Sequence, residues 1–340
     1  MTLTDPIAGE LAGHRFHLHP AYETGRRTVR VHEVRPLTDA ITHFRFVPVD
    51  GQPLTAYQPG SHLIVTAGEH RNAYSLVDDG MNPRSYGISV LRRGEGGGSD
   101  WLHDRAAAGD LLEVEGPRSM FPPVLDQHGA LLVAGGIGIT PVLSHARALA
   151  RAGRRADVVY SYRPGAAAHL DDLRELAERA GFGLHEATTV DDTVRVLRER
   201  FADQPLGTHA YACGPGPMLE TYLEVAAGSG WPDARVHLER FTAPEQDPGS
   251  PFTAVVASSG ERIDVPAGVS LLTRLLEHGL PVPNLCRQGV CGECRIPVRA
   301  ADGVVVHRDL ALSDEEKTAG DSMLCCVSRG VDRSEIEVQW

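Results

Sequence analysis

Three cysteines near the end of the chain limit what this sequence can fold into. Cys286, Cys291 and Cys294 are spaced C-x4-C-x2-C, and the neighbouring residues Cys325 and Cys326 follow about thirty residues later. With this spacing, one tight loop aims three thiolates at a 2Fe-2S cluster and a fourth thiolate arrives from another part of the fold. Such a cluster carries one electron at a time, so the rest of the chain should contain the source of those electrons.

Two other uses of these cysteines fit the spacing less well. A structural zinc site favours two C-x2-C pairs, and this sequence has one. A disulfide requires an oxidising compartment, for which nothing else in the sequence argues. Gly289 and Gly292 suit a cluster loop, because glycine allows a positive φ and lets backbone N–H groups approach the sulfurs.

Length and charge restrict the domain number and the partners. With 340 residues, 42% of them hydrophobic and 23% charged, the chain can form two or three ordinary globular domains. Its net charge of −12 argues against nucleic acid as a partner. No apolar run reaches the length of a membrane span and the N-terminus has no signal pattern. We therefore expect a cytoplasmic protein with no membrane partner.

The first segments are predicted to be a tail and a barrel. In residues 1–25, His14, His17 and His19 lie close together, and we expect a surface tail there rather than a metal site. Residues 26–125 contain short apolar runs separated by Gly, Pro and Asp turns, which predicts a small antiparallel β-barrel. The expected elements are strands at 28–34, 41–47, 61–65 and 86–91 and a helix at 100–108 with Ser99 as its N-cap.

From residue 126 to residue 243 apolar strands alternate with helices. This alternation predicts a parallel, doubly wound α/β sheet. The expected elements are strands at 130–134, 157–162 and 211–212 and helices at 142–151 and 171–180, with a further helix after Met218.

The last part of the chain is predicted to be a separate small domain. Residues 244–251 have the composition of a linker, because they include three prolines. In residues 252–340, a hairpin at 252–265 and a helix at 270–278 precede the cysteine loop. A hairpin, a helix and a cluster loop predict a β-grasp domain of the ferredoxin type.

Two predicted turns of the parallel sheet combine glycine with the start of a helix. A helix N-terminus supplies N–H donors for a phosphate, and two such turns at strand ends would flank one crevice. The alternatives are a plain tight turn and a small buried cysteine. Cys213 ends its strand, where we expect it to face a bound nicotinamide. The candidates are Gly135, Gly136, Gly138, Thr140 and Pro141 in one turn and Cys213, Gly214, Pro215 and Met218 in the other.

The predicted barrel places an aromatic ring beside a hydroxyl, which suits a flavin. Tyr74 would pack against the ring and Ser75 would hydrogen-bond to it. The glycines before residue 100 are a second candidate phosphate site, with a plain N-cap as the alternative. Arg118 is expected to assist a phosphate or the partner nucleotide. The candidate residues of this segment are Arg71, Asn72, Tyr74, Ser75, Leu76, Gly97, Gly98, Ser99 and Arg118.

In this order, the motifs resemble those of the phthalate dioxygenase reductase family, a group of ferredoxin–NADP reductase-like flavoproteins. The resemblance covers about residues 26–340. Residues 74–76 match the end of the family pattern R-x-Y-S-L, residues 135–141 match G-G-x-G-x-T-P, and residues 213–218 match C-G-P-x-x-M. The cluster loop matches C-x-x-G-x-C-G-x-C, and Cys326 begins a matching C-V-S-R, which implies that Cys326 is the fourth ligand.

The sequence departs from the family pattern at two positions. The family arginine lies two residues before the tyrosine, where this chain has Asn72, and Arg71 is one residue further back. Because neighbouring side chains on a strand point in opposite directions, Arg71 would reach a flavin phosphate only across a bulge. Ser119 also replaces the asparagine of the family's P-R-N-x-F.

The resemblance implies an electron chain. It implies a flavin barrel, a nicotinamide domain and a ferredoxin domain in one chain, with FMN, a 2Fe-2S cluster and NADH as cofactors. NADPH is an open alternative, because Arg163 could meet a 2′-phosphate. Tyr74, Ser75 and Cys213 are the expected catalytic positions, and Phe241 is an expected contact of the flavin ring.

The resemblance also implies a protein partner. We expect a monomer that passes electrons to a Rieske non-haem iron oxygenase, with a cytochrome P450 as the second choice. A different class of function is a regulatory flavo-iron-sulfur subunit of a larger complex. The two complete nicotinamide turns argue against that alternative, because a regulatory subunit would not need them.

Overall fold

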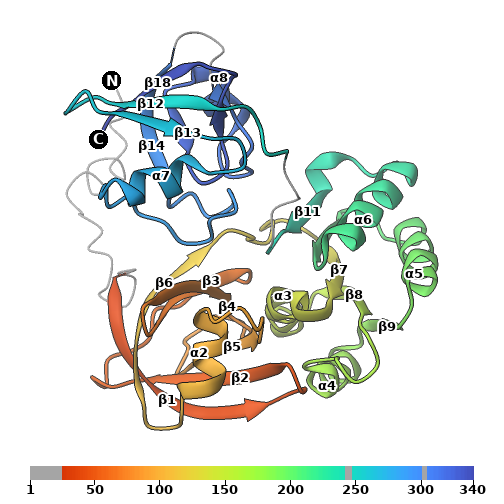
Figure 1. Ribbon diagram of the computed structural model, residues 1–340. Coiled ribbons are helices and arrows are strands. Elements are labelled where there is room, and N and C mark those ends of the chain that lie inside the picture. The colour runs from red at the N-terminus through yellow and green to blue at the C-terminus, as the bar shows by residue number, and fades with distance from the viewer. Residues whose placement is uncertain (1–24, 242–246, 301–304) are drawn as a thin grey trace, which may run out of the picture.

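The computed structural model describes residues 25–241, 247–300 and 305–340. Three sheets of different kinds follow one another along the chain, and each forms its own lobe (Figure 1). The histidines of the predicted tail, His14, His17 and His19, lie outside the described residues.

The first sheet is a nearly closed antiparallel barrel in the order β4-β3-β6-β1-β2-β5. An isolated bridge between Leu76 and Ile88 brings the two edge strands together. Alternate residues of β1, such as Val29 and Val31, are fully buried, as a strand with one face on a core requires. The elements are β1 (Arg26–Pro36), β2 (Ile41–Pro48), β3 (Ser61–Ala67), β4 (His70–Ser75), β5 (Tyr86–Leu91), α2 (Gly98–Arg105) and β6 (Leu111–Ser119).

The second sheet is parallel, in the order β11-β10-β7-β8-β9. Every residue of its central strand β7 is buried, because helices cover both faces. Its strands are β7 (Gly129–Gly135), β8 (Arg155–Ser161), β9 (Gly183–Ala187), β10 (Thr208–Cys213) and β11 (Val236–Glu239). Its helices are α3 (Ile139–Arg151), α4 (Leu170–Ala180), α5 (Val190–Ala202) and α6 (Gly216–Gly228), with 3-10 turns η2 (Gly136–Gly138) and η3 (Asp233–Arg235).

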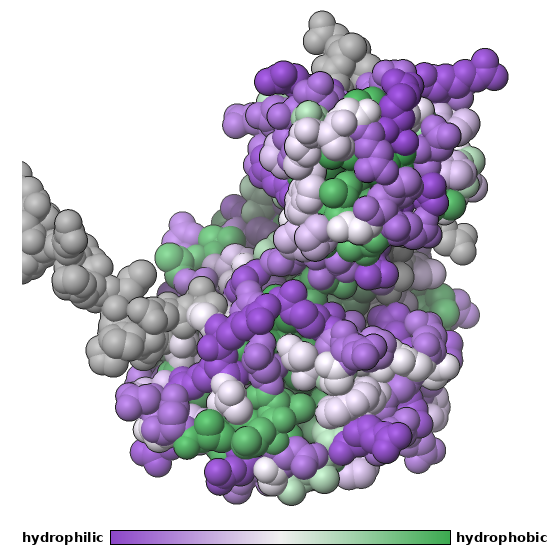
Figure 2. Space-filling model, turned by 60° about the vertical axis from the view of Figure 1, so that its left-hand side comes forward, coloured by the Kyte–Doolittle hydropathy of each residue, from purple (hydrophilic) through white to green (hydrophobic). Residues whose placement is uncertain are grey.

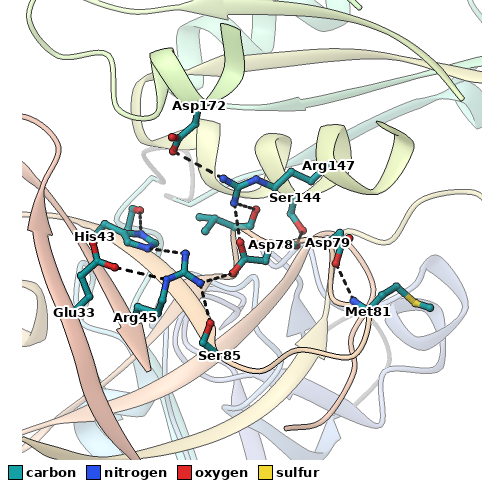
Figure 3. Close-up of polar contacts among 12 residues, drawn as sticks. Glu33, His43, Arg45, Asp78, Asp79, Met81, Ser85, Ser144, Arg147 and Asp172 are labelled. Carbon is teal, nitrogen blue, oxygen red and sulfur yellow. Dashed lines mark hydrogen bonds and ion pairs between the residues drawn. The ribbon is translucent and has the colours of Figure 1, made fainter. Parts of the chain in front are cut away.

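The barrel and the parallel sheet share a core and a polar boundary. Phe121 and Val77, which follow barrel strands, belong to the same buried cluster as Leu132 of β7. At the boundary, the guanidinium of Arg147 on α3 lies 2.8 Å from a carboxylate oxygen of Asp78 (Figure 3). These contacts fix the barrel against the parallel sheet.

The third sheet is mixed, in the order β13-β12-β18-β14-β16, beside a two-stranded ribbon of β15 and β17. Helix α7 begins after Ser270, whose hydroxyl accepts a hydrogen bond from the Thr273 N–H. The elements are β12 (Phe252–Val256), β13 (Arg262–Val265), α7 (Leu271–Glu277), β14 (Arg295–Ala300), β15 (Val305–Val306), α8 (Asp314–Ala319), β16 (Ser322–Leu324), β17 (Arg329–Gly330) and β18 (Glu335–Val338).

The predicted fold class is confirmed in all three lobes, and one local prediction is wrong. Ser99 is not the N-cap of α2, because the helix begins at Gly98 and Gly97 occupies the cap position without a side-chain hydrogen bond. The loop before the helix is instead ordered by Asp100, whose carboxylate accepts from the Gly94 and Gly96 N–H groups. No helix within the described residues is long and apolar enough to cross a bilayer.

Candidate functional site

The nucleotide crevice lies where the order of the parallel sheet reverses. β8 lies on one side of β7 and β10 on the other, so the chain leaves β7 and β10 at adjacent points of the same edge. Ala134 pairs with Cys213 in the register of these two strands. The turns after β7 and β10 therefore lie side by side, as the sequence predicted, and a ligand can contact both.

The two turns pack closely because glycines at the contact points have no side chain. A Cβ at Gly138 would lie 2.1 Å from the Cys213 carbonyl oxygen, and one at Gly214 would lie 2.4 Å from Cε of Met218. Gly136 differs, because it has a φ of +53° and a Cβ there would meet nothing within 4 Å. The backbone at Gly136 is therefore open to a ligand.

A buried carboxyl group stands beside Cys213. Glu239, the last residue of β11, pairs with Cys213 in the sheet register. Burial raises the pKa of Glu239 to about 8, and its Oε2 has no hydrogen-bond partner among the described residues. Burial, and secondarily the charge of Glu239, also raises the pKa of the Cys213 thiol. Both groups are therefore neutral at pH 7.

A cavity of about 700 Å³ joins this crevice to the barrel. Tyr74 and Ser75 at the end of β4 form part of its wall, and so does Thr140 of α3. The Tyr74 hydroxyl is buried without a hydrogen-bond partner among the described residues, and burial raises its pKa. Other lining residues are His62, Asn72, Ala73, Ser89, Leu91, Met120, Ile137, Leu238, Glu239, Arg240 and Phe241.

The start of α2 and a nearby arginine give part of the cavity wall the features of a phosphate site. Gly97, Gly98 and Ser99 at the start of α2 line the cavity, and so does Arg93 from the loop after β5. A Cβ at Gly98 would lie 2.3 Å from Oδ1 of Asn72, so this glycine allows the helix to approach β4 closely. Sequence reasoning missed Arg93; its only sequence signal was its place six residues before Ser99, the predicted N-cap.

Two predicted phosphate ligands lie away from this cavity. The register of β4 with β3 is unbroken, so no bulge turns Arg71 toward the flavin site. Instead, a terminal nitrogen of Arg71 lies 2.9 Å from Oε2 of Glu115. Arg118 contacts Glu115 and Glu293. Neither arginine lines the cavity, and their predicted contact with a phosphate is not supported by these positions.

The cysteine loop brings its sulfurs close to backbone N–H groups, and the thiols contact one another in two groups, Cys286 with Cys291 and Cys294 with Cys325 and Cys326. The Gln288 N–H donates to the Cys286 sulfur at 3.3 Å, and the Cys286 N–H donates to the Cys291 sulfur at 3.5 Å. Hydrogen bonds from the thiols of Cys325 and Cys326 lower the pKa of Cys294. Thiols that converge with backbone N–H donors are the donor set that an iron–sulfur cluster requires.

The two adjacent cysteines face different surroundings. The Cys325 thiol is fully buried and donates to the Cys294 carbonyl oxygen at 3.2 Å. Cys326 is also buried, and its sulfur is close to the Gly289 N–H. Gly289 has a φ of +74°, and a Cβ there would lie 2.6 Å from a methyl group of Val327. Gly289 therefore permits the loop to fold back over Cys326 and Val327.

The cluster loop forms another wall of the same cavity. Leu285, Cys286, Gln288, Val290, Cys291 and Leu310 line it together with the residues of the barrel and the crevice. Figure 2 shows the narrow waist where this lobe meets the rest of the molecule. Unpartnered buried oxygens come from all three lobes: the Tyr74 hydroxyl, Oε2 of Glu239 and Oε1 of Gln288. A polar ring system such as a flavin fits these residues, because it offers donors and acceptors to each.

Comparison with known proteins places the chain in a family. The family described as "Dimethylamine monooxygenase subunit DmmA-like, N-terminal domain" matches residues 120–236, and "2Fe-2S iron-sulfur cluster binding domain" matches residues 255–329. Phthalate dioxygenase reductase of Burkholderia cepacia is 32% identical over 90% of this chain and 95% of its own length. A solved structure of a phthalate dioxygenase reductase gives a TM-score of 0.71 at 31% identity, over 94% of this chain and 99% of that chain.

The chain belongs to the phthalate dioxygenase reductase family. Like the members of this family, it is an oxidoreductase. The solved phthalate dioxygenase reductase is described as a modular structure for electron transfer from pyridine nucleotides to 2Fe-2S. The heme-dependent oxidative N-demethylase beta subunit of Ectopseudomonas mendocina (strain ymp) is 40% identical over 89% of this chain and 95% of that protein. An intact type IV self-sufficient cytochrome P450 monooxygenase gives a TM-score of 0.74 at 32% identity, but this chain spans only 41% of its length.

Proposed function

We propose that this protein is the reductase component of a Rieske non-haem iron oxygenase. The observation that carries the proposal is that residues of the nicotinamide crevice, the flavin barrel and the cluster loop line the same cavity. When bound, FMN accepts a hydride from NADH and releases its electrons singly, and the cluster carries one electron at a time. The protein supplies binding, orientation and exclusion of water.

The proposed functional units follow the sequence division. Residues 26–125 bind FMN and residues 126–243 bind NADH. Residues 244–251 are the linker to residues 252–340, which hold the cluster. In this reading the protein acts as a cytoplasmic monomer. The six free cysteines agree with a reducing compartment.

The proposed residue roles follow from position in the cavity. Ser75 hydrogen-bonds the flavin ring and Tyr74 packs against it. Phe241, at the mouth of the crevice, contacts the ring or the nicotinamide. Arg93 and the first turn of α2 hold the phosphate, because an arginine beside a helix N-terminus offers both charge and N–H donors. Leu76, which is fully buried and bridges to Ile88, supports the wall rather than contacting a ligand.

The turns after β7 and β10 bind the nucleotide. Their backbone at Gly136 is open, and Thr140 and Pro141 lie in the first turn of α3. The neutral thiol of Cys213 borders the nicotinamide position. NADH is the proposed donor, and Arg163, which is exposed after β8, is the position at which NADPH would be recognised.

The proposed cluster ligands are Cys286, Cys291, Cys294 and Cys326. Support for Cys326 over Cys325 comes from the Gly289 N–H near its sulfur, because such donors stabilise a thiolate bound to iron. The Cys325 thiol is engaged by the Cys294 carbonyl instead.

A haem oxygenase is the second candidate for the partner. The 40% identity to a heme-dependent oxidative N-demethylase subunit favours it. The likeness to self-sufficient cytochrome P450 chains points to haem as well. The Rieske proposal rests on the family resemblance of the motifs.

An anaerobic NADH titration tests the electron chain. We expect both the flavin bands and the broad iron–sulfur absorption to bleach. If neither changes while dithionite reduces both, the regulatory-subunit alternative replaces the proposal. The partner is then tested by mixing NADH-reduced protein with a purified Rieske oxygenase or a haem oxygenase encoded near it. Rapid electron transfer to the haem protein alone would overturn the Rieske assignment.

A further inference from the structure

An arginine of the barrel bridges two carboxylates that belong to different lobes. One terminal nitrogen of Arg118, on β6, contacts Oε1 of Glu115, and the other contacts Oε1 of Glu293. Glu293 lies in the cluster loop, directly before Cys294. Among hydrogen bonds and ion pairs between described residues, Arg118–Glu293 is the one that joins residues 25–241 to residues 247–340.

The barrel side of this bridge is itself anchored. Oε2 of Glu115 lies 2.9 Å from a terminal nitrogen of Arg71 on β4 and 3.8 Å from Nε of Arg26 on β1. Because both oxygens of Glu115 are engaged, the Arg118 guanidinium is oriented before the cluster loop arrives. Such preorganisation lowers the entropy that docking would otherwise cost.

The pair is better shielded than an ordinary surface ion pair. The side chains of Glu115, Glu293 and Arg118 are 17%, 22% and 38% exposed. Fully exposed pairs contribute little, because water screens them and two long side chains must be ordered. Here the arginine is already ordered by Glu115, so the contact with Glu293 can bias the position of the loop.

We propose that Arg118 and Glu293 form a docking pair that holds the cluster loop against the flavin cavity. The proposal rests on the proposed function, because it concerns the step in which an electron passes from the flavin site to the cluster. Electron transfer slows exponentially with distance, so a loop that leaves the cavity wall would slow this step. Arg118 and Glu293 are positioning residues, since neither lines the cavity.

The test separates docking from electrostatic tuning of the cluster. Glu293→Gln removes a negative charge beside the cluster, and Arg118→Gln removes a positive one, so they shift the cluster's midpoint potential in opposite directions. Docking predicts that both variants nevertheless slow cluster reduction in the same direction, by about fivefold, as expected for loss of one partly exposed pair. The double variant should be no slower than either single variant, because the pair is lost only once.

The measurements are anaerobic stopped flow, with flavin bleaching and cluster bleaching followed separately, and hydrogen exchange of the loop at residues 286–294. We expect unchanged flavin reduction by NADH and faster exchange of the loop in both variants. Added salt should slow the cluster step of the wild type and leave that of the variants unchanged. Glu335→Gln is the matched control, since it breaks the exposed Arg262–Glu335 pair of the same lobe.

Two outcomes would overturn the docking pair. Opposite changes of the cluster step in the two single variants would show that charge sets the rate. Wild-type cluster reduction and loop exchange in both variants would show that the contact has no effect on docking. Failure of flavin reduction in the wild type is a different result, because it would contradict the proposed function instead.

Discussion

The carboxyl of Glu239 and the thiol of Cys213 occupy paired positions on the neighbouring parallel strands β11 and β10. Glu239 lines the cavity, whereas Cys213 is fully buried beside it and does not line it. A neutral carboxyl there can donate a hydrogen bond, whereas a carboxylate can only accept. The protonation of Glu239 therefore decides what this wall offers to a ligand.

The stability of the protein should depend on pH through Glu239. Its pKa is 4.5 when exposed and about 8 in the fold, so the folded state binds more protons between these values. A raised carboxyl pKa means that stability falls as pH rises from about 4.5 to about 8. Glu239→Gln should remove this fall, so the stability of the variant relative to that of the wild type should increase as pH rises from about 4.5 to about 8. Thermal denaturation of both proteins from pH 5 to pH 8 measures the difference, and parallel curves would contradict it.

Arg93 should contribute to FMN affinity. Arg93→Gln removes a charged donor at the proposed phosphate site of the cavity, and a charge-assisted hydrogen bond contributes about 1.5–3 kcal/mol, so FMN should bind about ten- to a hundredfold more weakly. Its neighbour Arg92 pairs with Asp104 outside the cavity, so Arg92→Gln is the matched control. Fluorescence titration of apoprotein with FMN measures both. Equal affinities in the two variants would remove Arg93 from the site.

The adjacent cysteines should differ in cluster retention. Cys326→Ser should lose most of the iron and the cluster absorption, because a proposed ligand is replaced. Cys325→Ser should keep the cluster, since a serine hydroxyl can also donate to the Cys294 carbonyl. Iron analysis and electron paramagnetic resonance of the reduced proteins compare the two. The reverse pattern would make Cys325 the fourth ligand.

Ser75 should act on hydride transfer without holding the fold together. Ser75→Ala is expected to slow flavin reduction by NADH about tenfold, the scale for losing one hydrogen bond to a reacting ring. Ser75→Thr keeps the hydroxyl and should restore part of the rate. Stopped-flow reduction and the melting temperature are measured together. Unchanged reduction in the alanine variant would refute the role.

The sequence predicted best what depends on local pattern. The alternation of buried strands and helices and the cysteine spacing led to the three lobes, and strand β5 was predicted at its observed bounds, Tyr86–Leu91. Strand β9 and helix α5 were not among the predicted elements, although α5 has a Thr189 cap. β9 is short and lies at the edge of the sheet, so its pattern is weak.

Contacts between distant segments could not be predicted. Arg118 and Glu293 lie 175 residues apart, and no local pattern connects them. Which arginine lines the cavity could not be predicted for the same reason. The motif pointed to Arg71, but Arg71 pairs with Glu115 and Arg93 lines the cavity. Ser99 was misjudged because a serine before a helix usually caps it, whereas Asp100 orders this loop through two backbone N–H groups.

The interlocking glycines of the nucleotide turns determine where diversity can be introduced into this protein. A Cβ at Gly138 would lie 2.1 Å from the Cys213 backbone oxygen, and one at Gly214 would lie 3.0 Å from the Gly135 backbone. A mutant library that varies Gly138 would therefore consist largely of damaged proteins, and variants of Gly214 would require the neighbouring atoms to shift. To change coenzyme preference, it is better to vary exposed side chains away from these glycines, such as Arg163. These turns thus combine glycine positions that leave little room for a side chain with an exposed arginine position nearby that can be varied.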